Sequence, residues 1–175
     1  MKVLGFAGFS GSGKTTLIEA VIPQLVQRGL RVSLIKHAHH EFDVDQPGKD
    51  SYRHRAAGAT QVLVSSRLRW ALMHELREAP EPSLKDHLTR MTECDIVIVE
   101  GYKHEPIAKI EVHRAAVQAP WLFRTDLNVV AIATDEVLET RLPRLDLNSP
   151  NQVADFIAKY VLSPASQLNK LTQVS

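Results

Sequence analysis

Cysteine is almost absent from this sequence of 175 residues. Its only cysteine, Cys94, cannot form a disulfide within the chain, which is typical of proteins in a reducing compartment. No apolar run approaches the roughly 18 residues of a membrane-spanning helix, and the apolar run at 3–7 is too short for a secretory signal. We therefore expect a cytoplasmic protein with no membrane partner.

An excess of charge of either sign is also missing. Lys and Arg number 21 and Asp and Glu 20, for a formal net charge of +1. This balance argues against a nucleic-acid partner. Hydrophobic residues make up 44% and charged residues 23%, which is the composition of a globular protein and excludes a disordered or fibrous chain. At this length we expect one domain over residues 1–162, followed by a frayed tail at 163–175.

Short apolar runs alternate with helical patterns along the chain. The runs that predict strands lie at 3–7, 31–36, 95–99, 107–112, 129–133 and 145–147. The patterns that predict helices lie at 13–28, 50–58, 83–91 and from 149 onward. This alternation predicts a three-layer α/β domain with a mostly parallel sheet. A hairpin at 61–65 and 70–74, together with the run at 107–112, predicts an antiparallel edge.

A phosphate-binding motif follows the first predicted strand. Residues 8–15 read GFSGSGKT and match G-x-x-x-x-G-K-[ST] at every fixed position. Glycines let the backbone turn so that successive N–H groups point at phosphate oxygens, and the following helix adds its partial positive charge. In this motif Lys14 reaches the β- and γ-phosphates, while the Thr15 hydroxyl binds Mg²⁺. The motif predicts a P-loop NTPase-like fold that binds a nucleoside triphosphate.

Two carboxylates follow later strands. Glu100 ends the run at 95–99, where a P-loop protein places the acid that holds Mg²⁺ directly or through water; the alternative is a solvated carboxylate. Asp135 lies just past the run at 129–133 and could read guanine, whose N1–H and N2 amino group both donate to one carboxylate. The alternative for Asp135 is a cap of the turn toward Glu136.

Histidines and acids cluster between residues 36 and 58. His37, His39 and His40 follow the second predicted strand, and they could contact a substrate or partner, bind a transition metal, or lie on the surface without a function. Asp45 or Asp43 could bind Mg²⁺ through water or position an attacking water. Asp50 is a candidate helix cap or contact residue.

Five stretches of this sequence resemble one protein family from about residue 3 to 160. They are IKHAHH (35–40), DVDQPGKDS (43–51), AGA (57–59), RWALM (69–73) and VEGYKHE (99–105). Together with the phosphate loop, they are similar to the MobB family of molybdopterin-guanine dinucleotide biosynthesis adapter proteins.

This resemblance implies a protein that binds GTP with Mg²⁺, hydrolyses it weakly at most, and forms homodimers. It implies an adapter that assists a MobA-type guanylyltransferase, with molybdopterin as a further partner. By position, it implies that the nucleotide-binding residues are Gly8, Ser10, Gly11, Ser12, Gly13, Lys14, Thr15, Thr16 and Gly101. Asp135 is a further candidate, for the base, through its place after the run at 129–133. The residues expected to act in hydrolysis are Lys14, Asp45 and Glu100. Those expected to contact a partner or substrate are Lys36, His37, His39, His40, Lys49, Asp50 and Lys103.

Two other functions remain open. A metal-delivery GTPase would use the three histidines at 37–40. A small-molecule kinase would need arginines over the phosphates, and Arg67, Arg69 and Arg77 are available but flank the predicted hairpin.

Overall fold

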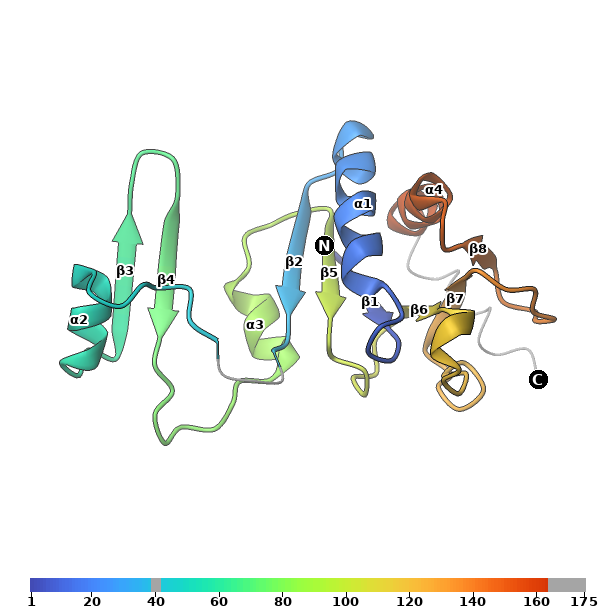
Figure 1. The fold of residues 1–175 in the computed structure, drawn as a ribbon. Helices are drawn as coiled ribbons and strands as arrows, with labels where there is room; N and C mark the ends of the chain where they lie inside the picture. Colours follow the sequence, from blue (N-terminus) through green and yellow to red (C-terminus); the bar gives the residue numbers. More distant parts are fainter. Residues whose placement is uncertain (39–41, 164–175) are drawn as a thin grey trace. The chain divides into compact units, whose positions relative to one another are not determined.

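The structure is a computed structural model that describes residues 1–38 and 42–163 (Figure 1). In chain order the elements are β1 (Lys2–Ala7), α1 (Lys14–Gln27), β2 (Val32–Lys36), α2 (Asp50–Ala56), β3 (Gln61–Ser65), β4 (Trp70–His74), α3 (Leu84–Arg90), β5 (Ile96–Glu100), β6 (Lys109–His113), the 3₁₀ helix η1 (Ala115–Val117), β7 (Val129–Thr134), β8 (Arg144–Asp146) and α4 (Pro150–Leu162). The chain divides into two compact units, residues 38–87 and the remainder. The single domain expected over 1–162 stays a prediction.

The larger unit contains a parallel sheet with the strand order β2-β5-β1-β6-β7-β8. In its register, Glu100 at the end of β5 lies opposite Phe6 of β1 and Lys36 of β2. Because carboxyl ends of parallel strands meet at one edge of the sheet, the loop after β1 lies at the same edge as Lys36 and Glu100.

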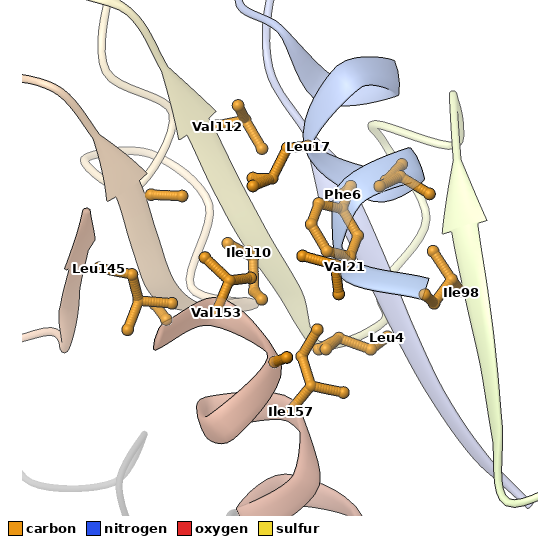
Figure 2. Close-up of a cluster of buried hydrophobic side chains, with 14 of the residues drawn as sticks. Leu4, Phe6, Leu17, Val21, Ile98, Ile110, Val112, Leu145, Val153 and Ile157 are labelled. Carbon is orange, nitrogen blue, oxygen red and sulfur yellow. The ribbon is translucent and has the colours of Figure 1, made fainter. Parts of the chain in front are cut away.

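One face of this sheet packs against α1 and α4 (Figure 2). Alternate strand residues such as Phe6 and Ile110 point to that face, as the period of two requires. The helices contribute apolar residues at helical spacing, among them Val21 of α1 and Val153 and Ile157 of α4, all fully buried. The helix predicted at 13–28 is therefore confirmed as α1, with one apolar face buried.

The opposite face carries three buried polar side chains on β6. The ammonium group of Lys109 donates to the carbonyl oxygens of residues 103 and 105 and to Asp126, each within 2.9 Å. Glu111 accepts the N–H groups of residues 122 and 123 at 2.7 and 2.8 Å, and the His113 ring stacks on Trp121 with centroids 3.6 Å apart. These interactions fix the segment 102–128 onto the sheet.

The expected antiparallel role of the run at 107–112 is wrong. It forms β6, which pairs in parallel with β1 on one side and β7 on the other. The hairpin prediction is confirmed, because β3 and β4 pair antiparallel with Leu63 opposite Leu72. This pair forms a separate two-stranded sheet in the smaller unit. The fold is therefore α/β, with a parallel six-stranded sheet and a separate antiparallel pair that is not an edge of that sheet.

Arg55 of α2 organises the smaller unit. Its guanidinium is within 2.7 Å of both Asp43 and Glu75 and within 3.4 Å of Asp45. Hydrogen bonds to Asp43 and Glu75 raise the pKa of Arg55, and the bond with Arg55 lowers the pKa of Asp43. The loop at 42–45 is thus tied to α2 and to the end of β4.

Across residues 1–38 and 42–163, no helix combines the length and apolar composition needed to cross a membrane. The expected tail from residue 164 onward lies outside the described residues.

Candidate nucleotide-binding site

The phosphate loop at 8–13 connects β1 to α1. Glycine is required at Gly8, because a Cβ there would lie 2.3 Å from the carbonyl oxygen of Val112. It is required again at Gly13, whose φ of +90° lies in the left-handed region. Among the described residues, no side chain caps α1 and none in its first turn is acidic. The first N–H groups of α1 are therefore suited to an anion.

Ser12 adds a second sign that this loop is built around a polar ligand. The residue is 2% exposed, and its hydroxyl oxygen hydrogen-bonds to no described residue. Leaving a buried polar group unsatisfied costs about 1–3 kcal/mol, which a ligand can offset. Around it, Ser10, Gly11, Thr15 and Thr16 are exposed, so this part of the loop is accessible.

Lys14 curls over the loop. Its ammonium group donates to the carbonyl oxygens of Gly8 and Phe9, both at 2.9 Å. Burial lowers the pKa of Lys14, an effect that Glu100 opposes and two neighbouring lysines reinforce. A partly desolvated cation beside the uncapped start of α1 is suited to bind phosphate.

Glu100 and Thr15 form an oxygen-rich pair beside this lysine. The Thr15 hydroxyl donates to Oε1 of Glu100 at 2.7 Å, and the Lys36 ammonium lies 3.5 Å from Oε2. Glu100 is 6% exposed, so it is not the solvated strand-end carboxylate of the alternative interpretation. Carboxylate and hydroxyl oxygens are ligands that Mg²⁺ prefers, so these residues fit that ion.

Three of the expected contact residues lie at the same edge. The Lys103 ammonium lies 4.0 Å from the centroid of the Phe9 ring, and the His37 N–H donates to the carbonyl oxygen of Glu100 at 2.9 Å. Gly101 approaches His37 so closely that a Cβ would lie 2.8 Å from its carbonyl oxygen. Lys36 and Lys103 therefore bring two ammonium groups to this edge, one beside Glu100 and one beside Phe9 of the loop.

His39 and His40 lie outside the described residues. Within 1–38 and 42–163, no three His, Cys, Asp or Glu side chains are grouped as metal ligands would be. The transition-metal interpretation of the histidine segment therefore stays a prediction that depends on these two residues.

The other expected residues belong to the smaller unit. Asp45 accepts hydrogen bonds from Ser51 at 2.8 Å and from Arg55 at 3.4 Å. Asp50 is the first residue of α2 and Lys49 its N-cap, so the prediction that Asp50 caps this helix is wrong. The catalytic role of Asp45 and the contact roles of Lys49 and Asp50 stay predictions.

Asp135 follows β7 and binds an unexpected partner. Its Oδ1 accepts the N–H of Ala115 at 2.8 Å, and its Oδ2 lies 3.4 Å from a guanidinium nitrogen of Arg114. The turn toward Glu136 is instead closed by Thr134, whose hydroxyl accepts the Glu136 N–H. Sequence reasoning missed Arg114, although its position directly after β6 placed it at the ligand edge of the sheet.

A pocket of about 330 Å³ opens at the ends of β7 and β8. Its lining residues are Thr134, Asp135, Glu136, Val137, Arg144, Leu145, Asp146, Asn148 and Gln152. Neighbouring strands in a sheet are about 4.8 Å apart. In the order β1-β6-β7-β8, the end of β7 is therefore about 10 Å from the end of β1, and the end of β8 is about 14 Å from the end of β1. The pocket and the phosphate loop therefore lie along the same edge of the sheet, two to three strands apart.

Comparison with known proteins places these features in a family. A family model described as molybdopterin guanine dinucleotide synthesis protein B (MobB) matches residues 3–135. Proteins named molybdopterin-guanine dinucleotide biosynthesis adapter protein are 46% identical over 162 residues in both Escherichia coli K12 and Haemophilus influenzae Rd. The alignments cover 91% of this chain and 93% and 89%, respectively, of those proteins. A crystal structure of molybdopterin-guanine biosynthesis protein B superimposes with a TM-score of 0.74 and 26% identity, over 92% of this chain and 99% of that one. The chain belongs to the MobB family.

Proposed function

We propose that this protein is a GTP-binding adapter of molybdopterin guanine dinucleotide biosynthesis. The observation that carries the proposal is the pairing of Thr15 with Glu100 beside an open phosphate loop, in a chain 46% identical to two proteins named as such adapters. The adapter role follows from the family, while the nucleotide, the metal and the partner are our proposals.

The triphosphate would be held by the loop and by the start of α1. The binding residues are Gly8, Ser10, Gly11, Ser12, Gly13, Lys14, Thr15 and Thr16, with Gly101 following Glu100. Thr15 and Glu100 would hold Mg²⁺, which neutralises phosphate charge. Lys14 would exchange its two carbonyl partners for phosphate oxygens. Any hydrolysis would be weak, with Lys14 and Glu100 at the phosphates. The role of Asp45 in positioning a water is proposed from the sequence alone.

The guanine base would occupy the pocket at the ends of β7 and β8. Asp135 lines this pocket, and a carboxylate with about four acceptor sites can accept from the base while it holds the Ala115 N–H. Guanine offers two adjacent donors to such a group, whereas adenine offers an acceptor at N1. This difference is the basis for proposing GTP over ATP.

The partner would be a MobA-type guanylyltransferase, which attaches GMP to molybdopterin in the cytoplasm. The positive edge formed by Lys36 and Lys103 next to the phosphate loop is suited to a phosphorylated substrate such as molybdopterin. We propose the same contact role for His37, His39, His40, Lys49 and Asp50.

A homodimer is the proposed assembly, through the hairpin β3–β4. Leu63 and Leu72 lie opposite each other and are 59% and 48% exposed, and Trp70 on the same face is 65% exposed. A two-stranded hairpin is marginally stable alone, and an exposed apolar face of this kind marks a site of association. A second copy presents the same face and can cover it.

Nucleotide titration of the isolated protein tests the proposal, with and without the guanylyltransferase. We expect Mg²⁺-dependent binding of GTP, weaker binding of ATP, and none in Lys14→Ala. This variant should stay folded, because the hydrogen bonds of the ammonium group to described residues go to two loop carbonyl oxygens and none goes to the core. In cells, loss of the protein should impair enzymes that use the dinucleotide form of the cofactor. Binding of GTP by Lys14→Ala at the parental affinity would contradict the proposed site.

A further inference from the structure

Arg114 lies against the phosphate loop. It directly follows β6, and its Nη2 and Nε atoms are 3.3 and 3.8 Å from the position that a Cβ on Gly13 would occupy. Three residues on, Cγ2 of Val117 is 3.8 Å from the corresponding position on Gly11. The segment 114–117 therefore packs beside two glycines of the loop, with a guanidinium at the start of α1.

The tether that holds this guanidinium is weak. Its one hydrogen bond among the described residues goes to Asp135, at 3.4 Å, and the Arg114 side chain is 38% exposed. Exposed ion pairs of this kind contribute about 0–1 kcal/mol. The Asp135 carboxylate is fixed separately by the Ala115 N–H at 2.8 Å, so it stays in place if Arg114 moves away.

We propose that Arg114 is a further nucleotide-binding residue, whose guanidinium leaves Asp135 and binds phosphate oxygens at the start of α1. This inference rests on the proposed binding of a nucleoside triphosphate. A guanidinium presents a planar fork of donors that matches phosphate oxygens in pairs, and the resulting bonds are about twice as strong as neutral ones. A phosphate bound at the N-terminus of α1 could accept two such bonds from Arg114. Asp135 now accepts one long bond from it, so Arg114 should bind the phosphate more strongly than it binds Asp135.

The exchange would also link the two halves of the site. When Arg114 moves to the phosphates, Oδ2 of Asp135 loses its partner at the edge of the pocket. That oxygen is then available to the donors of a base. Arg114 would thus make recognition of the base depend on recognition of the phosphates. A residue that only stabilised the position of η1 would not have this effect.

The experiment compares Mg²⁺-dependent GTP binding by the parent, Arg114→Ala, Arg114→Lys and Arg124→Ala. The last variant is the matched control, because Arg124 is an exposed arginine in the same segment, 102–128, as Arg114. We expect Arg114→Ala to bind GTP at least tenfold more weakly than the parent. The affinity of Arg114→Lys should lie between those of the parent and Arg114→Ala. Arg124→Ala should bind GTP like the parent. Inorganic triphosphate, competing with a labelled nucleotide, should also bind at least tenfold more weakly to Arg114→Ala.

Thermal unfolding distinguishes this role from a structural one. Loss of an exposed ion pair worth up to about 1 kcal/mol lowers the melting temperature by at most about 4 °C in a chain of this size. Parental GTP affinity in Arg114→Ala, or a loss for GTP without a loss for inorganic triphosphate, overturns the inference and leaves the proposed function standing. Failure of the parent to bind GTP overturns both.

Discussion

The Thr15 hydroxyl donates a 2.7 Å hydrogen bond to Oε1 of Glu100, across 85 residues of sequence. The parallel register of β1 and β5 creates this contact, because it places Glu100 opposite Phe6, just before the phosphate loop. Both side chains present oxygen atoms to one point at the edge of the sheet. A hydroxyl that donates to a carboxylate can turn its oxygen lone pairs to a cation once that cation binds.

Glu100→Gln tests this pair as a Mg²⁺ site. The amide keeps the shape of the side chain and still accepts a hydrogen bond from Thr15, but it lacks the negative charge that a divalent cation needs. We expect the strengthening of GTP binding by Mg²⁺, measured by calorimetry with and without the ion, to fall at least tenfold. Glu93→Gln, which changes an exposed carboxylate, should leave it unchanged. An undiminished effect of Mg²⁺ in Glu100→Gln would assign the ion to other ligands.

Lys14 predicts a pH dependence of GTP binding. Burial lowers the pKa of Lys14 in the free protein below 10.5, while Glu100 opposes the shift. A bound triphosphate would raise the pKa again, so the affinity for GTP should fall as the pH rises through the lowered pKa. For the same reason the folded protein binds fewer protons than the unfolded chain in the window below 10.5, and the Lys14 contribution to stability increases with pH there.

The measurement for Lys14 is calorimetry in buffers of different ionisation enthalpy. Binding should take up a proton in the alkaline range, and the uptake should disappear in Lys14→Arg, because arginine stays protonated. Equal uptake in that variant would assign the proton to another group.

The site elements adjacent in sequence were predictable, and those that depend on tertiary packing were not. The phosphate loop and α1 follow from a spacing of glycines and an apolar face that act locally. The Glu100 position follows from the rule that parallel strands end at one edge. The Arg114 contact does not, since it depends on how η1 folds back on the loop.

The error on β6 has a physical origin. Its sequence KIEVH alternates charged and apolar residues, a pattern typical of a strand with one solvated face. All five residues are nevertheless buried, because the segment 102–128 supplies acceptors for Lys109 and donors for Glu111. The polarity pattern of a strand does not show whether its polar face is exposed to water or covered by a loop that makes the same hydrogen bonds.

Glu111→Gln should destabilise the fold without touching the site. The carboxylate accepts two backbone N–H groups, whereas an amide accepts with only one of its two ends and leaves a donor facing a donor. The expected loss is about 1–3 kcal/mol in the free energy of unfolding, measured by urea denaturation. Glu139→Gln, on an exposed residue, serves as the control, and equal stability of the two variants would contradict the argument.

The same residue gives a pH signature. Burial raises the pKa of Glu111, an effect its two backbone partners oppose. The folded protein therefore binds more protons than the unfolded chain just above pH 4.5, and the Glu111 contribution to stability decreases as the pH rises through that window. In Glu111→Gln this part of the stability profile should be flatter than in the parent.

The hairpin face predicts the effect of surface charges on assembly. In a variant with Leu63→Asp and Leu72→Asp, a second copy would have to bury four carboxylates without partners, so the dimer should dissociate. Light scattering after gel filtration should give the mass of one chain, where the parent gives that of two. Leu127→Asp, at a residue 83% exposed in the other unit, should stay dimeric. A dimeric double variant would place the interface elsewhere.

Asp135→Asn tests how the base is read. Guanine donates from N1 and from its amino group, and an asparagine presents one acceptor and one donor in place of the two carboxylate oxygens. GTP should therefore bind at least tenfold more weakly, which corresponds to about 1.4 kcal/mol. Xanthosine triphosphate should bind in its place, because xanthine carries a carbonyl where guanine has its amino group.

Asp146→Asn is the matched control for this exchange, since Asp146 lines the same pocket. One oxygen of its carboxylate accepts the N–H of Asn148 at 2.8 Å, which resembles the way that Asp135 holds the N–H of Ala115. The Asn148 bond survives the substitution, because the asparagine oxygen can still accept it. Asp146→Asn should therefore keep the preference for GTP over xanthosine triphosphate. If the preference reverses in Asp146→Asn and not in Asp135→Asn, the base is read from β8, and Asp135 serves only to hold η1 and Arg114.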